Sequence, residues 1–140
     1  MSGITLPRWI YQALLAQARA VAPVEACAIL AGRERSVQAF FPMTNTEASA
    51  DRFMMDPAEQ FAVVRAVRAA GQEMLAIHHS HPATPAWPSA EDICRAVTPG
   101  VLYTILSLAD PASPDVRGFC IEGGAVAEVA VSVFADTASA

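Results

Sequence analysis

Residues that bind metals or move protons are crowded into the stretch from His78 to Asp92. His79 and His81 are two residues apart, so in an extended segment both imidazoles point to one face. Asp92 follows Ser89 by three residues, which places its carboxylate on the first turn of a helix, where it can reach back as a third ligand. Two histidines and one carboxylate, with water in the fourth position, are typical of a catalytic zinc site.

The same residues also have an ordinary structural interpretation. Ser89 can cap a helix, with Asp92 as the acid that complements the helix dipole. His78 should face away from His79 on a strand, which favours a supporting or core role over ligation. The metal-site hypothesis therefore rests on the joint occurrence of His-x-His-Pro and Ser-x-x-Asp after an apolar strand.

Length and composition indicate one well-filled domain. A chain of 140 residues is close to the usual size of a single domain, so we expect one domain over 1–140, with its core at 3–133 and a flexible tail at 135–140. Hydrophobic residues make up 54% and charged residues 16%, which argues against disorder. The sparsely charged surface leaves room for an apolar patch that forms a homodimer.

Charge and cysteine usage exclude several classes of protein. The net charge is −5 and all nine basic residues are Arg without a large cluster, so we expect no nucleic-acid partner. Cys27, Cys94 and Cys120 are widely spaced, which predicts neither a disulfide framework nor a thiolate zinc site, and we expect all three in the core. The missing C-x-x-C also excludes a zinc deaminase.

The first residues show no basic segment followed by an apolar run. No apolar stretch approaches the roughly 18–20 residues that a membrane span needs. We therefore expect a cytoplasmic protein with no membrane contact.

The periodicity of apolar residues predicts helices interspersed among about six strands, an α/β (α+β) arrangement around one curved sheet. Thr5 and Pro7 are typical of a helix start, and Asp56, Pro57 and Glu59 indicate a second start with a capping box. A third helix should begin at Ser89 and bury Ile93, Cys94 and Val97. Strands are predicted at 24–32, with Glu25 at the start, and at 37–41, 53–55, 74–78, 101–108, 116–122 and 125–134.

The run His79-Ser80-His81-Pro82, six residues, then Ser89-Ala90-Glu91-Asp92 resembles the motif of the JAMM (MPN+) zinc metalloproteases. Pro23 to Cys27 is similar to the glutamate-bearing strand of that family. Asn45 and the segment from Phe53 to Gln60 resemble its compact prokaryotic members, so that the likeness covers about residues 3–133. It implies the cytidine-deaminase-like JAMM/MPN fold, with a curved sheet flanked by helices.

Carried over by residue, the resemblance implies that His79, His81 and Asp92 hold one Zn²⁺ per chain. Glu25 would be the general base, and Ser89 would steady the oxyanion.

Trp87 and Asn45 are candidates for the substrate groove, although Trp87 suits a packing role equally well. The implied reaction is hydrolysis of an amide bond after the C-terminal Gly-Gly of a ubiquitin-like or sulfur-carrier protein.

Two departures from the family pattern bear on the substrate. Ala28 stands where many relatives have Gly, a change we expect to be tolerated. The chain is too short for the two insertions with which eukaryotic members grip linked ubiquitins, so we do not expect cleavage of polyubiquitin.

Two other functions fit the same fold. One is a noncatalytic scaffold, which the retention of all five chemical positions disfavours. The other is a peptidase of peptidoglycan or phage-tail type with the same zinc site, whose usual companion domain or export signal is not recognisable here.

Overall fold

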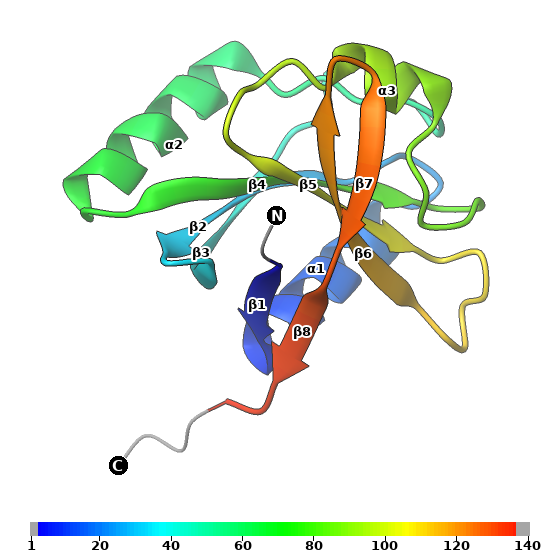
Figure 1. Ribbon diagram of the computed structural model, residues 1–140. Coiled ribbons are helices and arrows are strands. Elements are labelled where there is room, and N and C mark those ends of the chain that lie inside the picture. The colour runs from blue at the N-terminus through cyan, green and yellow to red at the C-terminus, as the bar shows by residue number, and fades with distance from the viewer. Residues whose placement is uncertain (1–2, 137–140) are drawn as a thin grey trace.

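The computed structural model describes residues 3–136, in which three helices and eight strands form one layered unit (Figure 1). All eight strands belong to one sheet with the order β7-β6-β5-β4-β2-β3-β1-β8. The elements are β1 (Ile4–Pro7), α1 (Arg8–Val21), β2 (Cys27–Arg33), β3 (Ser36–Met43), α2 (Pro57–Ala69), β4 (Glu73–His81), α3 (Ala90–Arg95), β5 (Leu102–Ser107), β6 (Asp115–Glu122), β7 (Ala125–Val129) and β8 (Val131–Phe134). The predicted curved, mixed sheet flanked by helices is confirmed.

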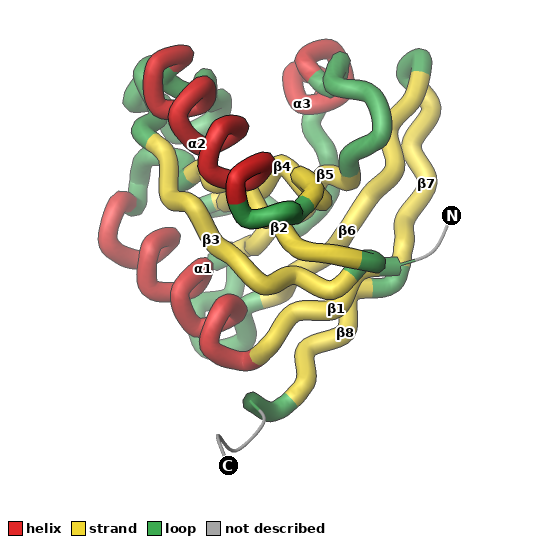
Figure 2. Tube along the Cα trace, turned by 90° about the vertical axis from the view of Figure 1, so that its left-hand side faces the viewer, coloured by secondary structure: helices red, strands yellow, loops and turns green. Residues whose placement is uncertain are grey.

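Each face of the sheet is covered by helices, with α1 on one side and α2 and α3 on the other (Figure 2). The central strands alternate between two hydrophobic clusters: Leu30 belongs to the α1 side, and Ile29 belongs to the side of α2 and α3. Because both faces are buried, these strands read as continuous apolar runs, as the sequence showed for β2 and β4.

The final strand was predicted as one segment over 125–134, and this is wrong. The strand is interrupted at Ala130, so that β7 pairs antiparallel with β6, whereas β8 pairs parallel with β1. Because β7 and β8 stand at opposite ends of the strand order, this short link curves the sheet almost into a closed barrel. Gly3 allows the approach, since a Cβ there would lie 2.2 Å from the Ala130 carbonyl oxygen.

The helix start predicted at Thr5 is also wrong. Residues Ile4–Pro7 form β1, and α1 begins at Arg8 without a side-chain cap. Thr5 lies opposite Ser132 of β8 and Ser36 of β3, so it is paired on both sides. Tertiary pairing of this backbone therefore outweighs the local capping preference.

The start predicted for α2 is largely confirmed. Asp56 Oδ1 accepts hydrogen bonds from the backbone N–H of Ala58 and Glu59, at 2.8 and 3.3 Å. Glu59 does not close a capping box; its carboxylate instead accepts from the Thr44 backbone N–H and hydroxyl, both at 2.7 Å. The second acid therefore ties α2 to the loop that follows β3.

Two local predictions fail around the site loops. The expected strand at 53–55 is reduced to a single bridge between Asn45 and Met55. Helix α3 ends at Arg95, so only Ile93 of its expected apolar residues packs against the core. Cys94 lies within α3 but is exposed, and Val97, which follows the end of the helix, is 80% exposed.

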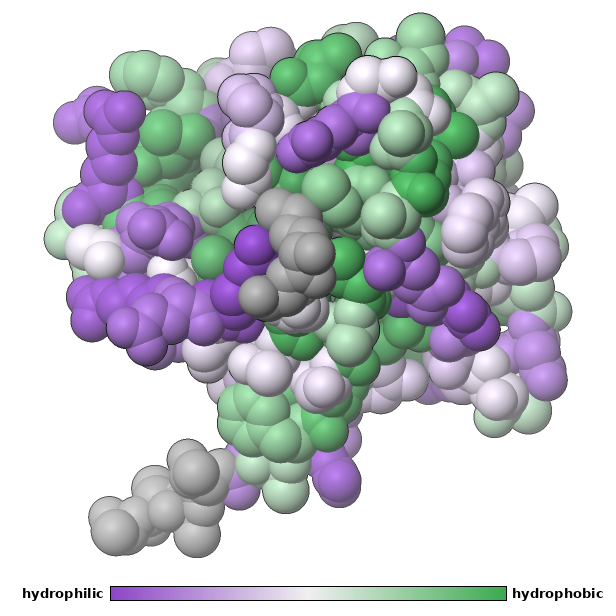
Figure 3. Space-filling model, in the orientation of Figure 1, coloured by the Kyte–Doolittle hydropathy of each residue, from purple (hydrophilic) through white to green (hydrophobic). Residues whose placement is uncertain are grey.

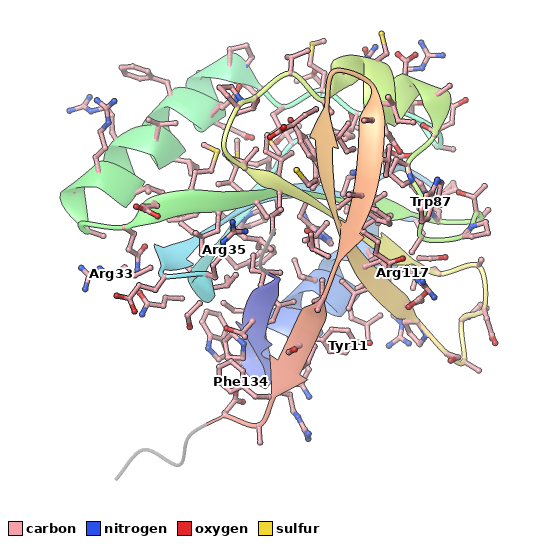
Figure 4. All side chains as sticks on the ribbon, viewed as in Figure 1. Tyr11, Arg33, Arg35, Trp87, Arg117 and Phe134 are labelled. Atoms are coloured by element: carbon pink, nitrogen blue, oxygen red, sulfur yellow. The ribbon has the colours of Figure 1, made fainter. Side chains whose placement is uncertain are left out.

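The end of the described chain is tied down at one point. The Asp136 carboxylate accepts a hydrogen bond from the Trp9 backbone N–H at 3.0 Å, and residues 137–140 of the expected tail lie outside the described residues. Phe134 lies at the end of β8, low in the view of Figure 4. Hydrophilic residues cover only parts of the face in Figure 3, with hydrophobic areas between them.

Among residues 3–136, none of the helices is long and apolar enough to span a membrane.

Candidate metal centre

Three side chains with metal-binding atoms converge where β4 ends beside α3. His79 and His81 lie on one face of β4, and Asp92 comes from the first turn of α3. The two Nε2 atoms are 3.1 Å apart, and Asp92 Oδ2 lies 3.1 Å from Nε2 of His79 and 3.0 Å from Nε2 of His81. The three residues are buried, with exposures of 2%, 3% and 8%.

A capping box fixes the third ligand. Ser89 precedes α3, and its Oγ accepts a hydrogen bond from the Asp92 backbone N–H at 3.0 Å. The Ser89 backbone N–H in turn donates to Asp92 Oδ2 at 2.9 Å. The ordinary helix-start interpretation and the ligand interpretation are therefore both compatible with the geometry, since the cap aims the carboxylate at the histidines.

The chemistry of the donor set fits a divalent cation. His81 Nδ1 lies 2.8 Å from the Pro85 carbonyl oxygen, which can only accept, so Nδ1 carries the proton and a neutral His81 presents a lone pair at Nε2. That lone pair faces a carboxylate oxygen and a second imidazole nitrogen, an arrangement that repels without a positive charge between them. Atoms bound to tetrahedral zinc at ~2.0–2.1 Å lie roughly 3.3 Å apart, within a few tenths of an ångström of this triangle.

Burial and mutual contact shift the titration of the three groups. Burial lowers the pKa of His79. For His81, burial acts downward, but the bonds to Asp92 and Pro85 outweigh it and raise the pKa. Burial opposes ionisation of Asp92, yet the bonds from His79 and His81 hold its pKa well below the usual range. Asp92 is therefore an ionised carboxylate across the neutral range.

Glu25 is brought to this site from the segment just before β2. It is only 2% exposed, and burial, followed by the charge of Asp92, raises the pKa of its carboxyl group from the usual 4.5 to about 8. Its charge also interacts with His81. Among the described residues Glu25 Oε1 has no hydrogen-bond partner. An unpartnered buried carboxyl beside a metal-ligand triangle is suited to exchange a proton with a molecule bound there.

The two residues expected in the substrate groove have different surroundings. Trp87 is 51% exposed on the loop between β4 and α3, and it makes an edge contact with the buried Phe119 at 5.0 Å between ring centroids (Figure 4). Asn45 uses its side-chain amide within the protein, including a 3.1 Å bond from Nδ2 to the Glu25 carbonyl oxygen. Trp87 thus retains a free face for a ligand, whereas Asn45 supports the loop around Glu25.

His78 and Cys27 take supporting places. His78 is fully buried facing away from the triangle, and its Nδ1 is 2.8 Å from the Thr104 hydroxyl. Cys27 lies opposite His79 in the sheet, but burial raises the pKa of its thiol to about 12. The thiol therefore stays protonated and serves as a core side chain, as expected. Cys120 packs against the core only in part.

Three groups that support the site were not predicted from the sequence. The Pro85 carbonyl orients His81, and the Phe53 ring stacks on His79 at 4.7 Å between centroids. Ser80, between the two histidines, accepts a hydrogen bond from the Ala26 backbone N–H, next to Glu25. Only Ser80 left a sequence signal: a small polar residue inside a strand that is otherwise continuously buried.

The sequence matches the family described as prokaryotic homologs of the JAB domain over residues 7–119. It is 40% identical over 126 residues to the CysO-cysteine peptidase of Mycobacterium tuberculosis, and the matched region covers 89% of this chain and 86% of that protein.

Two solved structures are similar as well. Protein DSY2949 from Desulfitobacterium hafniense has a TM-score of 0.88 and 41% identity, covering 95% of this chain and 94% of that one. AF2198 from Archaeoglobus fulgidus, a JAB1/MPN domain protein, has a TM-score of 0.64 at 20% identity, covers 96% and 100% of the two chains, and shares the fold. With the motif, the site and the extent of these matches in agreement, the chain belongs to the JAB (JAMM/MPN+) family of zinc metalloproteases, in its prokaryotic branch.

Proposed function

We propose that this protein hydrolyses the amide bond after the C-terminal Gly-Gly of a sulfur-carrier or ubiquitin-like protein, with His79, His81 and Asp92 holding zinc. The observation that carries the proposal is the Glu25 carboxyl, which is buried beside the three ligands and whose Oε1 has no hydrogen-bond partner among residues 3–136. A noncatalytic scaffold has no need for such a group, whose burial costs stability. Similarity to a CysO-cysteine peptidase supports the substrate class.

Zinc held by His79, His81 and Asp92 would lower the pKa of water toward ~7 and would polarise a carbonyl oxygen. Glu25 takes the proton of the attacking water at Oε1, the oxygen that has no partner in the described protein. Once it holds that proton, the same carboxyl group can return it to the leaving amine. One residue thus acts as base and then as acid.

Ser89 is placed to donate one further hydrogen bond. Its Oγ lone pair is occupied by the Asp92 N–H, which leaves the hydroxyl proton free to point elsewhere. A hydroxyl held in this way by a helix cap can donate to the carbonyl oxygen as negative charge develops on it. The capping interaction itself therefore orients the oxyanion donor.

The surface beside the ligands can receive an extended chain. A groove of about 380 Å³ is lined by Met54, Ile77, Val97 and Tyr103, and it borders Phe53, which stacks on His79. Val97 and Met54, which are among the exposed large hydrophobic residues, therefore offer apolar surface to a ligand in this groove. We place the residues that precede the Gly-Gly in this groove.

The test uses zinc-loaded protein and a sulfur-carrier protein that carries a C-terminal cysteine or a short peptide after Gly-Gly. Intact mass spectrometry should show loss of the added group and a product ending at Gly-Gly. A carrier whose last two glycines are replaced by valine serves as the control and should stay intact. Absence of cleavage by the zinc-loaded protein, together with cleavage of cell-wall peptides, would favour the peptidoglycan alternative. A homodimer and a cytoplasmic location stay predictions from the sequence.

A further inference from the structure

We propose that Ser80 and Asn45 are positioning residues, which hold Glu25 against the metal ligands through its backbone. The inference rests on the proposed function, in which Glu25 is the base. It concerns two side chains that do not contact the reacting atoms. It also changes the role expected for Asn45, from lining the substrate groove to orienting the base.

Glu25 needs such support because the regular sheet does not hold it. Strand β2 begins at Cys27, two residues later, so Glu25 lies outside the paired ladder. Its Oε1 atom has no partner among the described residues, so the carboxyl group is not anchored there. The position of the base therefore depends on the backbone contacts of Glu25 and Ala26.

Ser80 makes the contact on the side of β4. It is completely buried, and by strand alternation its side chain points away from the face of His79 and His81. Its Oγ accepts a hydrogen bond from the Ala26 backbone N–H at 2.8 Å, and its own N–H donates to the Ala26 carbonyl at 2.9 Å. The residue between the two metal ligands thus joins their strand to the neighbour of the base.

Asn45 makes the contact on the other side. Its Nδ2 donates to the carbonyl oxygens of Glu25 and Arg52, at 3.1 and 3.0 Å. Its Oδ1 accepts from the backbone N–H groups of Glu47 and Met54, at 3.1 and 3.2 Å. Reversing the amide would break all four bonds, so its orientation is set by the network.

The Asn45 loop also holds the other backbone group of Glu25. The Glu25 N–H donates to the Ser49 carbonyl at 2.8 Å. Asn45 organises the ends of this loop, so both backbone polar groups of Glu25 are bound to a segment that this one side chain ties together. Displacement of a catalytic group by about 1 Å can cost ~10²-fold in rate. Loss of either support should therefore slow turnover without removing a metal ligand.

The first arm of the test compares Ser80→Ala, Ser80→Thr and the control Thr104→Val. Thr104 is as buried as Ser80, and its hydroxyl bonds to His78, which lies on the same face of β4 as Ser80. Thr104→Val therefore also removes one buried hydroxyl group, but one that does not contact Glu25 or Ala26. Ser80→Ala should keep one zinc per chain and the KM of the wild type, with kcat lowered roughly 10- to 100-fold. Ser80→Thr, which keeps the hydroxyl group, should recover most of kcat, and Thr104→Val should keep it.

The second arm removes the other support. Asn45→Asp keeps both acceptor bonds of Oδ1 but replaces the two N–H donors by an oxygen that faces the carbonyls of Glu25 and Arg52. It should lower kcat in the same way as Ser80→Ala, with zinc retained. If Asn45→Asp instead raised KM and left kcat unchanged, the groove role expected from the sequence would stand and the positioning role would fall.

A readout without turnover uses the zinc-free protein. Amide hydrogen exchange followed by NMR should show at least a 10-fold faster exchange at Ala26 in Ser80→Ala and no such change in Thr104→Val. Wild-type kcat in Ser80→Ala, or a fall in kcat that merely follows loss of zinc, would overturn the inference. A wild-type protein that cleaves no carrier substrate would instead remove the proposed function, and the inference with it.

Discussion

The two faces of β4 carry similar polar side chains with different roles. On one face His78 and Ser80 each bond to a neighbouring segment, through the Thr104 hydroxyl and the Ala26 N–H. On the other face His79 and His81 bring their Nε2 atoms within 3.1 Å of each other and of Asp92. Because side chains alternate along the strand, the residues that bond to neighbouring segments lie on one face of β4, and the metal ligands lie on the other, which we call the chemical face.

The difference lies in how the buried polar groups are satisfied. Native cores pair most of their polar groups, and on the face of His78 and Ser80 the Nδ1 and Oγ atoms are paired with an adjacent hydroxyl and backbone N–H. Among the described residues the Nε2 atom of His78 has no hydrogen-bond partner, but burial lowers the pKa of His78 to about 3, so the ring stays neutral. The chemical face gathers electron-pair donors around one point, which is stable only with a positive charge among them. Convergence of donors, rather than the presence of histidine, marks the site.

The largest difference is expected between substitutions of the two adjacent histidines, His78 and His79. His79→Ala should reduce bound zinc from one per chain to almost none at equal concentrations of zinc and protein, and activity should fall by at least about 10³-fold, because two ligands cannot hold the ion. His78→Leu should keep zinc and lose only stability. Metal content by mass spectrometry decides the matter, and full zinc in His79→Ala would sink the site assignment.

Glu25→Gln probes the buried carboxyl group that lies beside the three ligands and is not one of them. The amide has the same shape but cannot take a proton, so kcat should fall by about 10²- to 10⁴-fold. Zinc content should equal that of the wild type, because Glu25 is not among the three converging ligands. Steady-state cleavage of the carrier substrate with parallel metal analysis tests both points, and normal turnover would exclude Glu25 as the base.

Ser89→Ala separates the two roles of the cap of α3. Loss of the hydroxyl should cost roughly 0.5–2 kcal/mol of stability. It should also lower kcat by about 10- to 10³-fold if the hydroxyl proton serves the oxyanion.

Asp56→Ala is the matched control for Ser89→Ala, because Asp56 caps α2 by the same kind of bond. Thermal unfolding, zinc content and kcat measured together should show both variants less stable, both with the zinc content of the wild type, and only Ser89→Ala slower. Equal kcat values in the two variants would leave Ser89 as a cap alone.

Local spacing explains which parts of the site the sequence could predict. His79, His81 and Asp92 lie within fourteen residues, on a strand and on the helix that follows it, so alternation and helix geometry already bring them together. Glu25 came only from the family resemblance, because its approach depends on the pairing of β2 with β4. Ser80 was missed because its partner is a backbone N–H more than fifty residues away, which no local pattern reveals.

The errors in the fold have the same origin. Thr5 has the local features of a helix cap, yet β8 and β3 pair with it from opposite sides. The run 125–134 has uniform strand character, and only the closure of the sheet divides it at Ala130. In both places long-range backbone pairing overrides a local preference that the sequence states correctly.

A further expected effect is a dependence of stability on pH that belongs to Glu25. Its carboxyl has a pKa of about 8 in the folded metal-free protein and about 4.5 when unfolded, so the folded state holds a proton that the unfolded state releases between these values. The stability linked to this proton is complete below pH 4.5 and is lost as pH rises toward 8, with a slope of at most about 1.4 kcal/mol per pH unit. Glu25→Gln cannot release a proton, so its metal-free form should lack this component. The difference in unfolding free energy between the two proteins, measured by urea denaturation from pH 5 to 8, therefore isolates Glu25 from the histidines, and parallel pH profiles would show that its carboxyl is not buried in its neutral form.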